Sequence, residues 1–166
     1  YNPTAPVSVG KYITGSGYRN VQVIGRYCYI VMDTSNVFDI IDISNPSAPV
    51  RSGYMGANNW YGFQVQGRYV YGVSSGGYFM GAYDISNAAS PNGTILGSGL
   101  GMQGPRAIFV SGRYAYVYEH AAQRISIVDI TIPSSLSLVG TVNVSSFTNI
   151  NAHSPQRLLS AQGRYI

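Results

Sequence analysis

Apolar and polar side chains alternate in short runs along the chain, and clusters of glycine, proline, serine and asparagine separate the runs. In one run, Tyr27 and Tyr29 would lie on one face, and Cys28 and Ile30 on the other. Alternation with a period of two is typical of β-strands. No window of helical length has apolar residues at i, i+3, i+4 and i+7. The pattern therefore predicts an all-β chain.

Two sequence anchors recur along the chain in one register. The first is Gly-Arg-Tyr, which begins at residues 25, 67, 112 and 163, at intervals of 42, 45 and 51. The second is an Asp-Ile pair, which begins at residues 42, 84 and 129, at intervals of 42 and 45. Because two independent anchors keep the same spacing, the chain is predicted to be built from an internal structural repeat.

Each repeat is predicted to contain four short strands, named a to d. In the first complete unit they are expected at 21–23, 27–32, 37–43 and 50–55. Gly25 and Arg26 would join strands a and b. Glycine at the first central position suits a two-residue type II′ hairpin, because φ is positive at that position.

Four strands per unit at this period are typical of β-propeller blades. Since each sheet has apolar residues on both faces, it needs neighbouring blades to bury them. We predict an all-β fold, a β-propeller of four-stranded antiparallel blades in an incomplete ring of three full repeats and two partial ones. The predicted boundaries are 1–20 for the end of a blade, 21–62, 63–107 and 108–158 for three blades, and 159–166 for the start of another.

The predicted units are too few for most propellers, which have about four to eight blades. We expect the chain to be part of a longer chain or of an assembly. In the second case, two copies would together form one ring of about seven blades. The longer chain is the interpretation that we favour.

The motifs of the first unit resemble a known family. They are V-x-V-x-G-R-Y-x-Y at 21–29, I-I-D-I-S-N-P at 40–46 and A-P-V at 48–50. This combination is similar to the LVIVD repeat, a propeller-forming repeat of bacterial, archaeal and some viral surface or secreted proteins. The resemblance extends over essentially the whole chain, although 83–85 and 128–130 keep only the Asp-Ile core. It implies a propeller fold and no particular reaction.

Composition and charge limit the possible partners. Charged residues make up only 10% of the 166 residues, and the net charge is +4 with an isoelectric point near 9.2. Four of the nine arginines belong to the Gly-Arg-Tyr turns, and without them the net charge is zero. We therefore expect no nucleic-acid partner, because no basic run remains to follow a phosphate backbone. No apolar run approaches the roughly 18 residues of a membrane span.

Cys28 is the chain's one cysteine, so no disulfide can form within the chain. By its register, Cys28 shares a strand position with Val70 and Ala115. We predict a small buried side chain at this position, since buried cysteines are usually inert.

Two segments match the sequence of a catalytic or nucleotide-binding motif but lack the secondary structure that the motif needs. Residues 72–76 fit G-x-S-x-G, but they leave a strand for a hairpin instead of a helix. Residues 99–104 fit G-x-G-x-x-G, but Pro105 and a strand follow them, so no helix N-terminus is present to hold a pyrophosphate. Both segments are predicted to be glycine-rich loops.

The titratable residues form no predicted catalytic or metal site. The aspartates of the Asp-Ile anchor recur where strand c ends, which favours a role in capping the turn. Glu119 and His120 are adjacent on a strand and would point to opposite faces. Besides them, only Asp33, Asp39 and His153 remain, at no spacing typical of metal ligands. We predict no catalytic residue, no metal and no cofactor.

A binding site is predicted where the strands nearest the central channel begin. In a propeller, strand a lines the channel, and the d–a and b–c loops share one face. The register places Arg19, Tyr61, Arg106 and Arg157 just before strand a, with Trp60 beside Tyr61. The longest d–a loop, 143–155, adds His153. Guanidinium groups bind carboxylates and phosphates, and aromatic rings cover sugars or cations. The alternative is that these arginines pair with the acids of neighbouring blades.

These features favour a non-enzymatic scaffold or recognition module of a surface-exposed or extracellular protein. Its partner would be a protein or an acidic glycan, held at the face of the d–a and b–c loops. One alternative is a propeller-type hydrolase or lyase whose catalytic residues lie in blades outside this segment. The other is a purely structural, self-assembling component.

Overall fold

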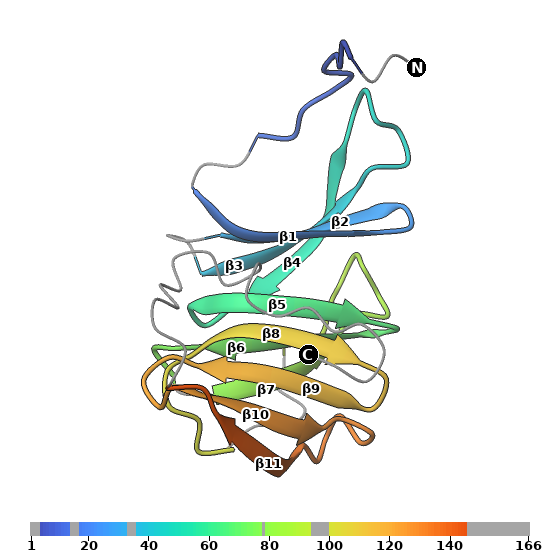
Figure 1. Cartoon of the computed structure of the whole chain (residues 1–166). Coiled ribbons are helices and arrows are strands. Elements are labelled where there is room, and N and C mark those ends of the chain that lie inside the picture. Colours follow the sequence, from blue (N-terminus) through green and yellow to red (C-terminus); the bar gives the residue numbers. More distant parts are fainter. Residues whose placement is uncertain (1–3, 14–16, 33–35, 78, 94–99, 146–166) are drawn as a thin grey trace.

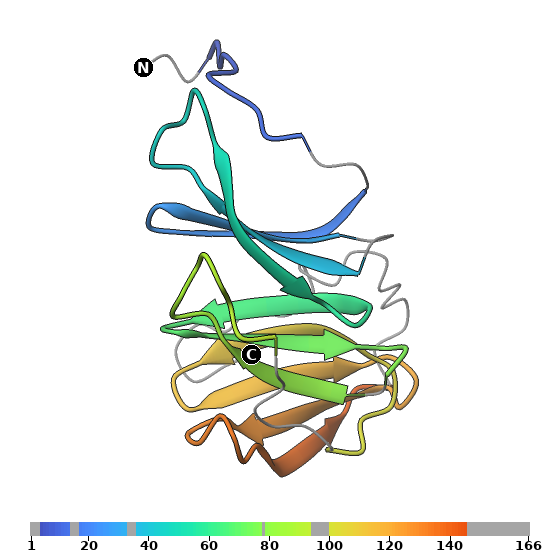
Figure 2. The same cartoon turned by 180° about the vertical axis from the view of Figure 1, so that it is seen from behind.

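The computed structural model describes residues 4–13, 17–32, 36–77, 79–93 and 100–145. Within these ranges the chain forms eleven strands and no helix, so no described helix could cross a membrane. The strands form separate antiparallel sheets that follow one another along the chain (Figure 1, Figure 2). The all-β prediction is confirmed.

The first and third blades are four-stranded. In the first, the strands are β1 (Tyr18–Ile24), β2 (Tyr27–Met32), β3 (Val37–Asp42) and β4 (Val50–Gly56), paired in that order. In the third, they are β8 (Pro105–Ser111), β9 (Tyr114–Glu119), β10 (Arg124–Asp129) and β11 (Ser137–Asn143). Strand a of the first blade begins at Tyr18, three residues before the predicted start, and the other predicted strand starts are confirmed.

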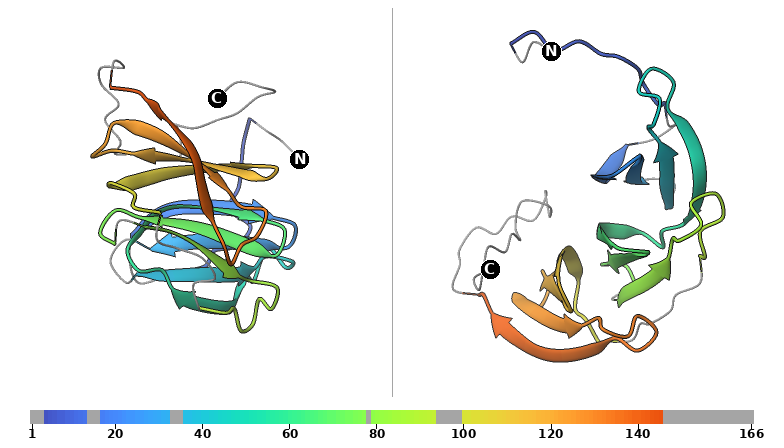
Figure 3. Two further views of the ribbon diagram at one scale, coloured as in Figure 1. Left: turned by 90° about the horizontal axis from the view of Figure 1, so that it is seen from below. Right: turned by 90° about the vertical axis from the view of Figure 1, so that its right-hand side faces the viewer.

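The second blade contains β5 (Trp60–Gln66), β6 (Tyr69–Ser74) and β7 (Phe79–Asp84). The repeat spacing of 42 places its outer strand at 92–97, and of these residues 94–97 lie outside the described ones. Seen end-on, the blades stand side by side in an open arc, with β1, β5 and β8 on its inner side (Figure 3). The predicted propeller architecture with an open ring is confirmed.

The repeated Gly-Arg-Tyr turns have the predicted hairpin geometry. Gly25, Gly67 and Gly112 have φ values of 58°, 61° and 59°. The arginine that follows each glycine is not in this positive region. A positive φ at the first central position only is what a type II′ turn requires.

Apolar side chains from adjacent blades form the cores. Tyr29, Phe38 and Met55 of the first blade pack with Phe63 and Val65 of the second. A second cluster joins the second and third blades in the same way and includes Tyr71, Val110 and Val128. The second blade therefore packs against the first blade with one face and against the third blade with the other.

Glutamine side chains also connect the inner strands of adjacent blades. The backbone N–H of Val65 donates to Gln22 Oε1 at 2.8 Å. Gln64 occupies the equivalent position in the next blade, where its amide donates to the carbonyl of Val110 at 3.2 Å and accepts from the N–H of Val110 at 2.6 Å. These bonds fix the inner strands side by side around the channel.

Apolar side chains on the outward faces of the first and third blades are exposed in the described part of the chain. Val23 is 57% exposed, whereas Val65, at the same position one blade later, is 5% exposed. Val142 of the third blade is 52% exposed, whereas the equivalent Met55 is 4% exposed. Cys28 lies on the outward face of the first blade and is half-buried, so the prediction of a buried cysteine is wrong. The equivalent Val70 is fully buried, because the preceding blade covers it.

Candidate functional site

The d–a and b–c loops meet at one end of the blades, which we call the mouth face. The N–H of Ala57 in a d–a loop donates to the carbonyl of Asn36 in a b–c loop at 2.6 Å. In the third blade, the N–H of His120 donates to the carbonyl of Gly104 at 2.9 Å. The inner strands β1, β5 and β8 begin at this face, as the sequence predicts for the site.

Arg19, Tyr61 and Arg106 come together at the mouth face from three successive blades. Each is the second residue of its inner strand. The Cζ atom of Arg19 lies 4.1 Å from the centroid of the Tyr61 ring, and that of Arg106 lies 5.6 Å from it. Both distances are within the range of a cation–π contact. One aromatic ring is thus flanked by guanidinium groups from the blade before it and the blade after it.

Arg19 is also held by the loop that precedes β5. Its Nη1 donates to Asn59 Oδ1 at 3.1 Å and to the carbonyl of Trp60 at 3.3 Å. Asn58 and Asn59 have positive φ values of 42° and 58°, which asparagine tolerates better than most residues. This turn was not singled out in the sequence, although adjacent asparagines are a recognised turn signal.

Trp60 does not belong to the surface of the mouth face, so this part of the predicted site is wrong. Its side chain is 1% exposed and lies in the core between the first and second blades. Its ring packs against Tyr83, with centroids 4.9 Å apart, and Phe38, at 5.5 Å. The pairing of β5 with β6 shifts register between Trp60 and Gly62, so Tyr61 is an extra residue without a partner on β6. Such a bulge redirects a side chain, which leaves Tyr61 at the mouth while Trp60 points into the core. The predicted site residues His153 and Arg157 lie outside the described residues.

The recurring arginines and aspartates of the two sequence anchors pair within each blade. Arg26 pairs with Asp42, Arg68 with Asp84 and Arg113 with Asp129. Each aspartate also accepts the N–H of the residue two positions later, at 2.9 Å in all three turns. The predicted turn-capping role is therefore confirmed. The arginine pairing was missed, although a constant separation of 16 residues between the partners signals it.

The other two acids in the described ranges have buried carboxylates, each paired with a partly exposed arginine. Asp39 pairs with Arg51. Glu119 is fully buried and accepts from Arg124 Nη2 at 2.9 Å, from the backbone N–H of Gln103 at 2.5 Å and from the hydroxyl of Ser126. All oxygens of the Glu119 carboxylate are therefore used in holding the third blade together.

For Arg106, the alternative of a pair with an acid of a neighbouring blade finds no support among the described acids. All five of these carboxylates pair with an arginine of their own blade. Within the described part of the chain, the guanidinium of Arg106 makes its contact with the Tyr61 ring and forms no ion pair. Its Nε atom is buried and has no hydrogen-bond partner there.

The ion pairs of the turns give an expected acid response. The hydrogen bond from Arg26 lowers the pKa of Asp42 to about 2, and that from Arg113 lowers the pKa of Asp129 to about 2. Because these folded-state values lie below the unfolded value of about 3.9, the stabilisation is complete above that pH and is lost as the pH falls toward 2. In the variant Asp42→Asn, Asp129→Asn, we expect lower stability at pH 7 and little difference at pH 2. Urea titrations monitored by circular dichroism at both pH values would measure this. An equal loss at both would contradict it.

The two segments that match catalytic letter patterns are structural. Ser74 is fully buried, donates its hydroxyl to the carbonyl of Asn58 at 2.8 Å and accepts from the N–H of Gly77 at 3.1 Å. Gly101 and Gly104 have φ values of 61° and 62° and turn the chain into β8. The first segment runs from the end of β6 into a hairpin, so only its last two residues lie in the predicted loop. Residues 100–104 of the second segment form a loop, and residue 99 lies outside the described residues. The described residues place no three metal-ligating side chains together.

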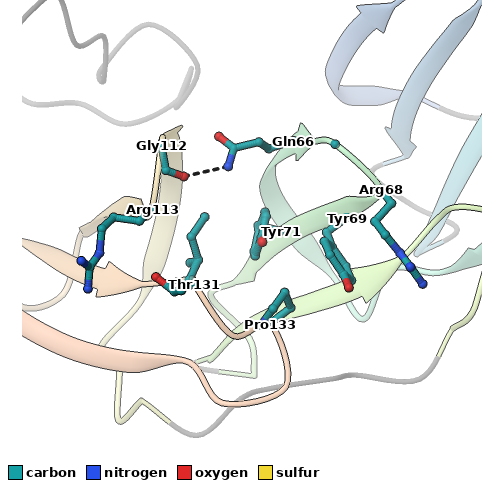
Figure 4. A pocket seen from close by; sticks show the side chains of 10 residues that line it. Gln66, Arg68, Tyr69, Tyr71, Gly112, Arg113, Thr131 and Pro133 are labelled. Carbon is teal, nitrogen blue, oxygen red and sulfur yellow. Dashed lines mark hydrogen bonds between the residues drawn. The ribbon is translucent and has the colours of Figure 1, made fainter.

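A groove lies at the opposite end of the blades, between the a–b turns of the second and third blades. Its volume is about 560 Å³. Figure 4 shows Arg68 and Arg113 at its two sides, with Tyr69, Tyr71, Thr131 and Pro133 between them. We call it the Tyr69 groove. It was missed in the sequence, because it arises only when the turns of two blades stand next to each other.

The family model that describes the LVIVD repeat matches residues 17–55 and 105–144. The chain carries LVIVD repeats. The matched stretches coincide with the first and third blades, and the second blade, between them, has the same strand order as far as it is described. No curated protein matches the chain at a significant level.

Solved structures similar to the LVIVD chain include enzymes and a complex. A candidate 6-phosphogluconolactonase from Bacteroides fragilis has a TM-score of 0.66 at 16% identity, with 81% of this chain and 41% of that chain covered. A chain of a nidogen–laminin complex has a TM-score of 0.58 at 13% identity, with 80% and 49% covered. The glutaminyl cyclase of Myxococcus xanthus has 0.54 at 12% identity, with 79% and 54% covered. The LVIVD chain thus spans about half the length of these proteins or less, and the likeness shows the propeller fold alone.

Proposed function

We propose that this LVIVD chain is part of a recognition module that binds an acidic group of a glycan or protein partner at the mouth face. The module would belong to a surface-exposed or extracellular protein, as a section of a longer chain or an assembly. It would act by binding and not by catalysis. The low content of charged side chains, with a single lysine, supports a polar and aromatic recognition surface.

The observation that carries the proposal is the state of Arg106. This cation packs on Tyr61, and the five described carboxylates are all paired with other arginines. Its Nε is removed from water and makes no hydrogen bond within the described residues. A guanidinium in such surroundings gains more from a carboxylate partner than one that is already paired, because the attraction is less screened. Tyr61 keeps the group in place and offers an aromatic surface beside it.

The proposal is tested by binding to an array of sialylated, uronic-acid and neutral glycans. We expect the acidic glycans to be retained and Arg106→Ala to weaken that binding about tenfold or more, which corresponds to about 1.4 kcal/mol. Arg26→Ala is the matched control, because it removes one arginine at the opposite end of the blades and outside the Tyr69 groove. Equal losses in both variants would indicate a non-specific charge effect. Unchanged binding in Arg106→Ala would remove the mouth face from consideration.

A further inference from the structure

The Tyr69 groove combines an apolar floor with hydrogen-bonding groups at its sides. The rings of Tyr69 and Tyr71 lie 6.5 Å apart and tilted, and Pro133 faces them across the groove (Figure 4). The volume of about 560 Å³ falls within the range of roughly 300–1,000 Å³ that is usual for small-molecule sites. An apolar surface with a few polar groups around it is the common composition of such sites.

The two arginines of the groove supply donors without net charge. The guanidinium of Arg68 is bonded to Asp84 and that of Arg113 to Asp129, yet both arginine side chains remain more than half exposed. The pairing arginine lowers the pKa of each aspartate, so both pairs stay ionised and neutral overall across the physiological pH range. Because each arginine is already neutralised by its own aspartate, an anion would gain less here than at an unpaired guanidinium, and the exposed N–H groups favour an uncharged polar ligand.

Acceptors are present beside these donors. Gln66 donates its amide N–H to the carbonyl of Gly112 at 2.7 Å, which fixes the side chain across the two blades and leaves its carbonyl oxygen to accept (Figure 4). The hydroxyl of Thr131 donates to Asp129 Oδ1 at 2.6 Å, so its lone pairs remain available. Donors and acceptors therefore alternate around an aromatic and proline surface.

We propose that the Tyr69 groove binds a neutral oligosaccharide. A pyranose ring has apolar C–H faces and a rim of hydroxyl groups that both donate and accept hydrogen bonds. The half-buried Tyr69 and Pro133 suit the faces, and the arginines, Gln66 and Thr131 suit the rim. Tyr71 is 3% exposed and forms the base of the groove beneath them. This site is at the opposite end of the blades from the mouth face, and its proposal does not depend on binding there.

The preceding pair of blades provides a natural comparison for the groove. One repeat earlier, Ile24 stands at the position of Gln66 and Ala88 at the position of Pro133, while the arginine and tyrosine of the turn are kept. The variant Gln66→Ile, Pro133→Ala therefore copies side chains that the fold already accepts at these positions. It removes a fixed acceptor and an apolar wall without changing any charge.

The test uses a glycan array that carries neutral hexose oligosaccharides together with sialylated and sulfated oligosaccharides. We expect binding to neutral oligosaccharides that is unchanged between 50 and 500 mM NaCl. It should fall about tenfold or more in Tyr69→Ala and in Gln66→Ile, Pro133→Ala, and stay unchanged in Arg106→Ala. Circular dichroism and thermal melting would verify that each variant is folded, and the double variant keeps the test decisive if Tyr69→Ala unfolds.

Three results would overturn the proposal. They are the absence of binding to any neutral oligosaccharide, salt-sensitive binding limited to acidic ones, and neutral binding that both groove variants retain. Because Arg106→Ala leaves the groove intact, loss of acidic binding in that variant concerns the mouth face alone. The two sites can thus fail separately.

Discussion

Replacing Trp60 with alanine is expected to lower the free energy of unfolding by about 3–5 kcal/mol. The indole is 1% exposed and lies in the core that joins the first and second blades. It packs on Tyr83 and Phe38, and a Cβ built on Gly72 would lie 2.3 Å from its ring. Since the ring fills the space above this glycine, its removal leaves a cavity that the rigid strands around it cannot close. The variant would also lose the contact of the indole with Phe38 of the first blade and the apolar surface that the indole buries.

The neighbouring residue serves as the control. Tyr61→Ala removes an aromatic ring of comparable size one position along the same strand, but from the half-buried mouth face. We expect a loss of about 1 kcal/mol there, mainly from the cation–π contact with Arg19. Urea denaturation monitored by near-ultraviolet circular dichroism would give both values. Similar losses in the two variants would mean that Trp60 is not the anchor between the blades.

The fold could be predicted from the sequence because it depends on features that recur. The type II′ turn at Gly25 and the capping aspartate Asp42 each appear once per blade, so their spacing reports the blade period. The same register predicted that Arg19, Tyr61 and Arg106 lie at one end of the inner strands, and the structure places them together there. Residues at equivalent positions of successive repeats can therefore be placed at the same end of the blades from the sequence alone.

The remaining features depend on what lies next to each blade. Trp60 and Tyr61 are adjacent aromatic residues, and only the direction in which each points separates the core from the site. Cys28 shares its position with the buried Val70, yet it is half-buried, because burial here is provided by a neighbouring blade. The Tyr69 groove likewise needs two blades to exist. The local sequence pattern predicts the strands within one blade, but it does not predict which side chains are buried, or which grooves form, between two blades.

The substitution Gly53→Ala is expected to destabilise the chain by about 1–3 kcal/mol, whereas Gly140→Ala is expected to be neutral or slightly stabilising. The two glycines are equivalent, since Gly53 in β4 pairs with Ile40 and Gly140 in β11 pairs with Ile127. A Cβ on Gly53 would lie 2.2 Å from the carbonyl oxygen of Ala88 and 3.1 Å from Ala89 C. A Cβ on Gly140 would meet nothing within 4 Å.

The cause of the difference is the loop of the following blade. Its backbone crosses directly over Gly53, and a backbone cannot move aside as a flexible side chain can. Gly10 has the same close contact with the carbonyl oxygen of Pro46, so the crossing recurs between segments that are one blade apart. Among the described residues no backbone crosses over Gly140, so glycine there has only its usual entropic disadvantage in a strand. Thermal melts of both variants would measure the effect. Equal effects in both would show that the glycine serves the strand itself and not the contact between blades.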